Sequence, residues 1–327
     1  MNKANEFAMQ YTETAQAIGI KPEAYDVHFR RLTAANLGEM SFFIFSNVYK
    51  EGRPRAPTKQ QTIRQQPACG LCKDVDRAKT KGDNIMFKDD YTPFVVIPNL
   101  FPLDFGHAML VDKQHLDEYY CAPDRTKLET IVRFTDETGL RCFRNVHGTN
   151  SSMPNHEHVH IMPVQFPVEY VETREIAEGI EELVSFPGQH SVFSGENRAI
   201  GAYDFISRLQ KEKHPSEDMQ KLGMFPYVIL FASSKIYVAP IRVPQYPKPG
   251  SIGAGEIFGV YATPIKKKLL DKGVTEEKWN SISAEERANT ILQIQASIMH
   301  RELWNTIVEV LFPHDSSELN VKKLVKA

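Results

Sequence analysis

The sequence predicts an α+β fold with two lobes, each built from antiparallel strands and packed helices. In the first half, the β-rich runs "PFVVI" and "HAMLV" are separated by Pro, Asn, Asp and Gly residues, which predicts an antiparallel pair of strands. After "APDR", a helix is predicted by the spacing of Leu128, Ile131, Val132 and Thr135. Strands and helices begin again from about Val171, so a second lobe is expected.

The second half contains further predicted elements. We expect helices in "VETREIAEGIEELV" and "DFISRLQKEKH", separated by the polar loop "SFPGQHSVFSGENRAIGAY". The runs "FPYVILFASSKIYVAPIRV" and "GEIFGVYATPI" are typical of strands, and the tail over 275–327 predicts helix. The expected organisation is an N-terminal extension over 1–52, a first lobe over 53–170 and a second lobe over 171–327.

Charge and hydropathy restrict the class of protein. The 327 residues include 39 Lys and Arg against 41 Asp and Glu, which argues against extended contacts with nucleic acid but permits a local pocket for a small anion. No run approaches the roughly 18 apolar residues that span a bilayer, and the first residues lack the apolar core of a secretory signal. We therefore expect a cytoplasmic protein without membrane contact.

The four cysteines are too few for a disulfide scaffold in a chain of this length. Cys121 and Cys142 are expected to be core residues. Cys69 and Cys72 form a CxxC pair, which in a reducing compartment indicates a metal site or a redox site.

Three histidines at alternate positions stand out in "NHEHVHIMPV". On a strand, His156, His158 and His160 would project from one face, spaced roughly 6.5 to 7 Å apart. Three imidazoles pack poorly in a core, because each has two ring nitrogens to satisfy. Two chemistries fit them better, namely metal ligation and nucleophilic or general acid–base catalysis.

The loop before these histidines favours phosphate chemistry. It contains small and polar residues, whose backbone N–H groups and hydroxyls can approach phosphate oxygens closely. Those residues include Asn150, Ser151 and Ser152.

At this point the sequence resembles the histidine-triad (HIT) superfamily, whose motif of alternate histidines followed by two apolar residues is matched by "HEHVHIM". Asn145, eleven residues before His156, stands where that family and galactose-1-phosphate uridylyltransferase place a phosphate-contacting asparagine. Upstream, "VVIPNLFPLDFGHAMLVDKQH" resembles the strand-turn-strand of the family. The resemblance covers about 84–163 and implies HIT-like antiparallel sheets.

The resemblance also implies a structural zinc ion. Zinc-containing members combine a CxxC pair with the histidine that closes the second strand and the first histidine of the triad, which here gives Cys69, Cys72, His115 and His156. Such a Cys2His2 set would fill a tetrahedral site and leave no position for substrate. The metal and the nucleophile would then use different histidines.

The same resemblance assigns roles to the remaining candidate residues. His158 would be the nucleophile, with a ring nitrogen donating to the carbonyl of His156, while His160 and Asn145 would bind phosphoryl oxygens or the leaving group. His107 is left undecided between a structural hydrogen bond and a substrate contact. Substrate-binding roles are expected for Asn99, Asn150, Ser151 and Ser152.

The length of the chain is similar to that of the two-lobed branch, which includes galactose-1-phosphate uridylyltransferase and diadenosine tetraphosphate phosphorylase. This implies a nucleotidyltransferase or phosphorylase that acts on a nucleotide polyphosphate or nucleotide-sugar, with phosphate or a sugar phosphate as acceptor. Many transferases of this branch have Gln where this chain has His160, which makes a dinucleoside polyphosphate or nucleotide phosphoramidate hydrolase the first alternative. A non-catalytic nucleotide-binding module is the second. The active site in this branch lies within one chain or is completed across a homodimer.

Overall fold

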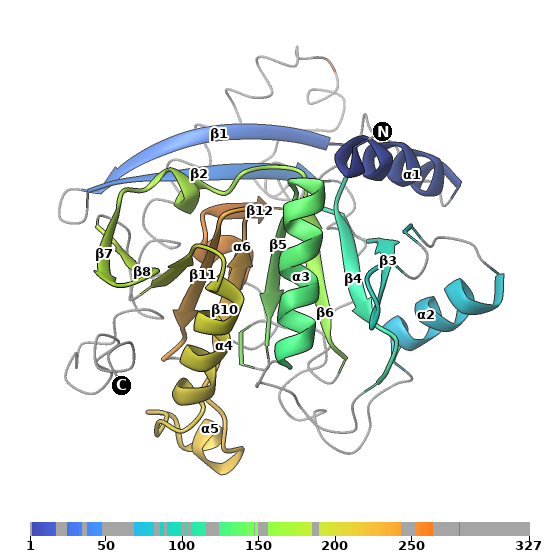
Figure 1. Cartoon of the computed structure of the whole chain (residues 1–327). Coiled ribbons are helices and arrows are strands. Elements are labelled where there is room, and N and C mark those ends of the chain that lie inside the picture. The colour runs from blue at the N-terminus through green and yellow to red at the C-terminus, as the bar shows by residue number, and fades with distance from the viewer. Residues whose placement is uncertain are drawn as a thin grey trace.

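The computed structural model describes residues 2–17, 25–34, 38–47, 69–81, 86–87, 90–99, 102–103, 106–115, 124–146, 148–149, 156–184, 190–242, 253–263 and 281. Within them, a nine-stranded antiparallel sheet has the strand order β3-β4-β6-β5-β10-β11-β9-β8-β7 (Figure 1). Its strands are β3 Phe94–Pro98, β4 Ala108–Asp112, β5 Arg141–Asn145, β6 His158–Met162, β7 Thr173–Ala177, β8 Ile180–Leu183, β9 Ser191–Ser194, β10 Tyr227–Phe231 and β11 Lys235–Pro240.

Both halves of the chain contribute to this sheet. Strands β3 to β6 come from the first half, and they join the strands of the second half where β5 pairs with β10, with Asn145 opposite Val228. The expected antiparallel pair is confirmed as β3 and β4. The α+β fold class is confirmed, while the division at 170/171 stays a prediction.

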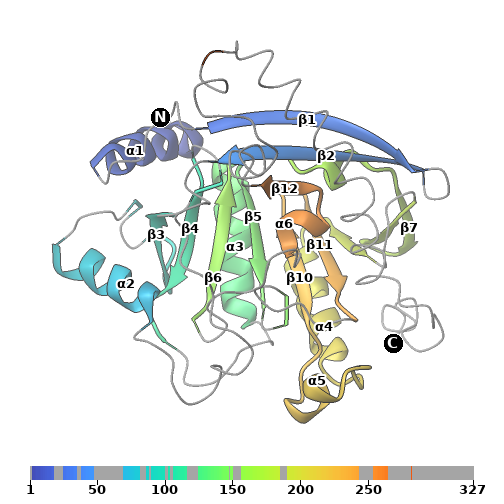
Figure 2. The ribbon, with the colours of Figure 1, turned by 180° about the vertical axis from the view of Figure 1, so that it is seen from behind.

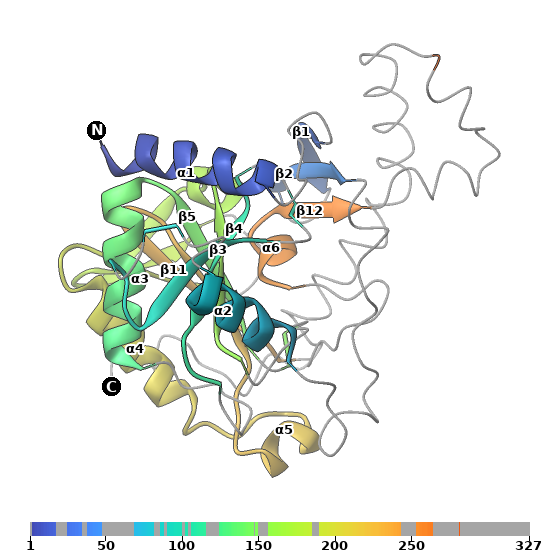
Figure 3. The same cartoon turned by 90° about the vertical axis from the view of Figure 1, so that its right-hand side faces the viewer.

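One face of the sheet is covered by helices α3 Arg125–Thr138 and α4 Arg198–Leu209, with α1 Lys3–Ala17 beside α3 (Figures 1 and 3). Helix α3 begins within "APDR", at Arg125, as expected, because the side chain of Asp124 accepts a hydrogen bond from the backbone N–H of Lys127. It ends at Gly139, whose φ of 69° is a left-handed conformation that suits glycine.

The opposite face carries a second apolar cluster beneath α6 Ala254–Ile257 and η4 Pro167–Tyr170 (Figure 2). Met162 belongs to this cluster, and Phe143, also in it, stacks on His160 with ring centroids 4.7 Å apart. Since side chains alternate along β6, His158 and His160 project from this face, away from α3. A three-stranded sheet of β1 Tyr25–Ala34, β2 Gly38–Asn47 and β12 Val260–Thr263 lies at the same side of the molecule (Figure 3).

The prediction of a helix in "VETREIAEGIEELV" is wrong, because β7 and β8 form a hairpin there. Its turn contains Gly179, with φ of 67°. Arg174 lies opposite Glu182, and their side chains form an ion pair across the strands. Pairing of β8 with β9 attaches the hairpin to the sheet, so tertiary pairing overrides the helical propensity of the glutamates.

Other differences are smaller. The expected polar loop contains β9 and the start of α4, and two short helices, α2 Gly70–Lys81 and α5 Glu217–Lys221, lie outside the predicted elements. The run "GEIFGVYATPI" contains α6 before β12. Of the predicted helical tail over 275–327, the structure describes residue 281 alone, which is helical. Across the described residues, no helix combines the length and the hydropathy needed to cross a membrane.

Candidate active site and metal centre

Four side chains from three separate segments meet at one end of β4 and β6. Cys69 and Cys72 lie at the start of α2, His115 follows β4, and His156 lies two residues before β6. Their ligand atoms all lie within 4.8 Å of one another. This is the set that the resemblance implied for zinc.

Four of the six distances between ligand atoms are close to those around a tetrahedral ion. The Sγ atom of Cys72 lies 3.2 Å from Nδ1 of His115, and Nδ1 of His156 lies 3.4 Å from Sγ of Cys69, Sγ of Cys72 and Nδ1 of His115. Zinc–sulfur bonds of about 2.3 Å and zinc–nitrogen bonds of about 2.0 Å would place tetrahedral ligand atoms roughly 3.3 to 3.8 Å apart. Two thiols and two imidazoles are also the donors that zinc prefers.

The ring of His156 is oriented for this role. Its Nε2 lies 2.9 Å from the carbonyl oxygen of Asp112, to which it donates, so that Nδ1 faces the cysteines. Burial alone raises the pKa of the Cys69 thiol, but the contact with the His156 ring and a hydrogen bond with the backbone of Cys72 outweigh it and lower that pKa. The thiolate that a metal requires is therefore favoured.

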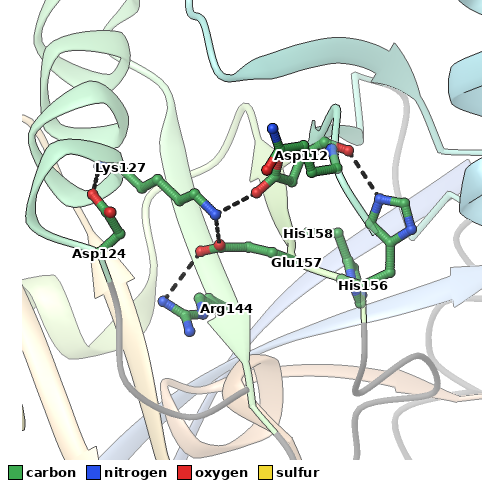
Figure 4. A network of polar contacts seen from close by, with 8 residues as sticks. Asp112, Asp124, Lys127, Arg144, His156, Glu157 and His158 are labelled. Atoms are coloured by element: carbon green, nitrogen blue, oxygen red, sulfur yellow. Dashed lines mark hydrogen bonds and ion pairs between the residues drawn. The ribbon is translucent and has the colours of Figure 1, made fainter. Parts of the chain in front are cut away.

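A buried charge network supports the other side of the same strands (Figure 4). Lys127 of α3 lies between the carboxylates of Asp112 and Glu157, with its Nζ 2.9 Å from Oε2 of Glu157 and in contact with Asp112. Arg144 approaches the other oxygen of Glu157 at 3.5 Å. Both carboxylates are 1% exposed, and Glu157 stands between the first two triad histidines, so the network fixes the backbone that carries them.

Burial opposes the charge on Lys127, but the two carboxylates outweigh it and raise the pKa of the ammonium group. The lysine therefore stays charged at neutral pH. The backbone N–H of Asp112 donates to the carbonyl oxygen of Glu157 at 3.0 Å, which joins the end of β4 to the residue before β6. Sequence reasoning missed this network, because its members are separated by up to 45 positions along the chain.

His158 makes the backbone contact that the sequence analysis expected. Its Nδ1 lies 2.8 Å from the carbonyl oxygen of His156. A carbonyl only accepts, so Nδ1 carries the proton of the neutral ring and Nε2 carries the lone pair. The ring is 7% exposed and its centroid lies 5.2 Å from that of His160. His156 itself lies just before the strand, with its ring turned to the cysteines instead of sharing the face of the other two.

His160 is held by His107, which the sequence left undecided. Nδ1 of His107 accepts a hydrogen bond of 2.8 Å from the backbone N–H of Leu103, so its proton lies on Nε2. That Nε2 is 3.0 Å from Nδ1 of His160, which therefore accepts, and the proton of His160 lies on its own Nε2. Nδ2 of Asn99 lies 3.1 Å from the same Nε2 of His107. Because that nitrogen carries a proton, the amide of Asn99 fits with its two ends exchanged, so that its Oδ1 accepts there.

Asn145 lies at the end of β5, on the same face as Phe143, His158 and His160. Its Oδ1 accepts a hydrogen bond of 2.7 Å from the backbone N–H of Ala254, a contact that sequence reasoning missed. The structure thus brings His158 and His160 together on one face with Asn145, and places Asn99 beside His107. Asn150, Ser151 and Ser152 lie outside the described residues.

The described residues thus combine a nine-stranded antiparallel sheet, two alternate histidines on β6 and a neighbouring Cys2His2 cluster. No family model and no curated protein matches the chain by sequence. Among solved structures, the yeast Ap4A phosphorylase Apa2 shares the fold, with a TM-score of 0.58 over 98% of this chain and 97% of that chain, at 12% identity.

Two further structures of the same yeast protein agree. Its complex with Ap4A gives a TM-score of 0.60 over 94% of this chain and 97% of that chain, and its complex with AMP gives 0.56 over 96% and 98%. Both are 13% identical to this chain. The predicted likeness to the two-lobed HIT branch is confirmed as a likeness of fold.

Proposed function

We propose that this chain is a nucleotidyltransferase or phosphorylase that acts on a nucleotide polyphosphate or nucleotide-sugar through a covalent nucleotidyl-His158 intermediate. The observation that carries the proposal is the 2.8 Å contact between Nδ1 of His158 and the carbonyl of His156. It selects the tautomer whose Nε2 is a nucleophile, and the same carbonyl stabilises the positive charge that the ring acquires on attack.

In the first step, Nε2 of His158 attacks the α-phosphorus of the substrate. The nitrogen–phosphorus bond forms as the bond between phosphorus and the bridging oxygen breaks, and that oxygen leaves on a polyphosphate or sugar phosphate. In the second step, an oxygen of the acceptor attacks the same phosphorus and the nitrogen–phosphorus bond breaks, which restores His158. With diadenosine tetraphosphate and inorganic phosphate the products would be ATP and ADP.

The neighbouring residues would bind the phosphoryl oxygens. The Nε2–H of His160 is a donor because His107 binds the opposite ring nitrogen. The Nδ2 group of Asn145 is a second donor, since Oδ1 of the same amide accepts a hydrogen bond from the backbone N–H of Ala254. A zinc ion bound by Cys69, Cys72, His115 and His156 would be structural and would hold the chain just before β6 in place.

The proposed substrate class is supported by the fold neighbour and by the hydrogen-bond donors of the site. The yeast protein of the same fold is an Ap4A phosphorylase that has been crystallised with Ap4A and with AMP. A dinucleoside polyphosphate is therefore the first substrate to test, with phosphate as the acceptor. His160 specifically favours hydrolysis as the second candidate, because its position is occupied by Gln in many transferases of this branch and by His in the hydrolases.

The test is to incubate the protein with labelled diadenosine tetraphosphate or a GDP-sugar, with and without phosphate, and to identify the products. A phosphorylase requires phosphate and incorporates it into one product, whereas a hydrolase turns over in its absence. His158→Ala is expected to remove both activities and leave the fold intact. Full turnover by that variant would refute the proposed nucleophile.

A further inference from the structure

The segment at residues 253–254 of the second half lies against a candidate substrate-binding residue of the first half. Gly253 and Ala254 are both buried, and α6 begins at Ala254. The backbone N–H of Ala254 donates to Oδ1 of Asn145, 109 positions earlier in the chain, at 2.7 Å. This hydrogen bond joins the end of β5, in the sheet that carries the triad, to the start of α6.

The hydrogen bond determines which end of the Asn145 amide faces the rest of the site. With the amide reversed, Nδ2 would face the N–H of Ala254, and two donors would oppose each other. The observed arrangement therefore keeps Oδ1 on Ala254 and leaves Nδ2 as the group offered to a ligand. A donor suits phosphate oxygens, which only accept when fully ionised.

Gly253 makes this arrangement sterically possible. A Cβ atom at this position would lie 2.8 Å from Oδ1 of Asn145, 3.4 Å from its Cγ and 3.3 Å from the carbonyl oxygen of Thr149. The φ of Gly253 is outside the positive range, so alanine could adopt the backbone conformation. Glycine is therefore required at this position because a larger side chain would collide with Asn145, and not because of the backbone conformation.

The loop on the other side of Gly253 is also fixed. The Oγ1 of Thr149 lies 2.7 Å from both the backbone N and the carbonyl oxygen of Val146, and the backbone N–H of Thr149 donates to the same carbonyl at 3.1 Å. Gly148, with φ of 82°, lies against Pro226, where an added Cβ would be 2.8 Å from the proline ring. Because the carbonyl of Thr149 is held in this way, an added methyl group at Gly253 would displace the Asn145 side chain instead.

We propose that Gly253 and the N–H of Ala254 are positioning residues that hold the Asn145 amide with Nδ2 directed at the phosphoryl group of the substrate. This inference rests on the proposed function, in which Asn145 binds that group. It gives the second half of the chain a defined part in catalysis, since a residue on β5 is oriented by the start of α6.

The test is a double-mutant cycle between Gly253→Ala and Asn145→Ala, measured as kcat and KM with diadenosine tetraphosphate and phosphate. Gly253→Ala is expected to lower kcat roughly tenfold. Removal of a whole oxyanion donor costs more, about 100- to 1000-fold in kcat. In the Asn145→Ala background the added methyl group meets no amide, so Gly253→Ala should change kcat little further. Independent, multiplying losses in the double variant would overturn the inference, as would unchanged kcat in Gly253→Ala.

Two further variants separate positioning from loss of folding. Ala254→Pro removes the N–H donor at the first position of a helix, where proline is tolerated, and should show the same dependence on Asn145. Gly201→Ala, in α4, is the matched control, because its Cβ would meet a ring carbon of Phe193 at 3.1 Å on the other face of the sheet. It should change the thermal midpoint at most and leave kcat unchanged.

The proposed function and this inference fail in different ways. Turnover that persists in His158→Ala contradicts the proposed function. Turnover that is lost in His158→Ala, yet kept at the full rate in both Gly253→Ala and Ala254→Pro, leaves the proposed function standing and contradicts the positioning role.

Discussion

The Nδ1 atom of His158 lies 2.8 Å from the carbonyl oxygen of His156, whose own ring faces Cys69 and Cys72. A residue whose side chain belongs to the Cys2His2 cluster thus orients the candidate nucleophile through its backbone. Displacement of His156 would move the hydrogen bond that fixes the tautomer of His158. The Cys2His2 cluster and the candidate active site are therefore coupled through two positions of the chain at the start of β6.

Cys72→Ser should reduce both bound zinc and stability. Replacing a thiolate ligand weakens a Cys2His2 site, and the binding free energy of a structural metal is part of the folding free energy. Elemental analysis of the purified protein should give about one zinc per chain for the unaltered protein and clearly less for the variant, with a lower thermal midpoint. Cys142→Ala, in a cysteine buried beneath α3, is the control and should retain the metal. Equal zinc content in Cys72→Ser would contradict the assigned ligand set.

Lys127→Met should destabilise the fold by about 3 to 5 kcal/mol, since it leaves the buried carboxylates of Asp112 and Glu157 without their shared cation. The matched control on the same helix is Arg125→Met, whose ion pair with Glu129 is exposed and should contribute less than about 1 kcal/mol. Urea unfolding at neutral pH measures both. Similar losses for the two variants would show that the network does not support the strands as described.

His107→Asn should lower kcat roughly tenfold or more and leave KM nearly unchanged. The asparagine can still accept from the N–H of Leu103, but it is too short to reach Nδ1 of His160, so the tautomer of His160 is no longer fixed. His214→Asn is the control, because His214 is also buried and accepts a backbone N–H, but donates to the carbonyl of Ile241. That variant should lose stability and keep its kcat. An unaltered kcat in His107→Asn would contradict the role of the hydrogen bond from His107 in fixing the tautomer of His160.

His214 should make the stability depend on pH. Burial lowers the pKa of its imidazole in the folded protein, although hydrogen bonds to the backbone at Ile241 and Ser216 oppose the effect. The unfolded chain therefore binds the proton first, and the free energy of unfolding falls as the pH drops below about 6.5, by at most about 1.4 kcal/mol per pH unit for one proton. Urea unfolding at pH 7.5 and 5.5 should show a smaller decrease in His214→Asn than in the unaltered protein. Equal decreases would rule out His214 as a source.

Local patterns were sufficient to predict several parts of this fold. The runs around β3 and β4 carry their own turn signals, and the start of α3 depends on Asp124, four residues from Leu128. The triad was recognisable because its three histidines alternate within five residues of the chain. By contrast, β7 and β8 are strands because β8 pairs with β9, and no local signal in their glutamate-rich sequence outweighs its helical propensity.

The parts of the site that sequence reasoning missed depend on long-range contacts. His107 orients His160 from 53 positions away, and Ala254 binds Asn145 from 109 positions away. The Gly106-His107 pair was a visible signal, but its partner could not be inferred from spacing. Glu157 alternates with the histidines and was visible as well, yet Lys127 is its partner only because α3 packs on that face of the sheet.

The central claim is that His158 bonds covalently to phosphorus, and trapping that bond tests it most directly. The protein is mixed with diadenosine tetraphosphate labelled at the α-phosphate, without acceptor, denatured in alkali and digested for mass spectrometry. The account predicts an acid-labile adenylyl group on the peptide that contains His158, which disappears when phosphate is added before denaturation and is absent from His158→Ala. An adduct on another residue, or turnover with inversion at phosphorus and no labelled peptide, would contradict it.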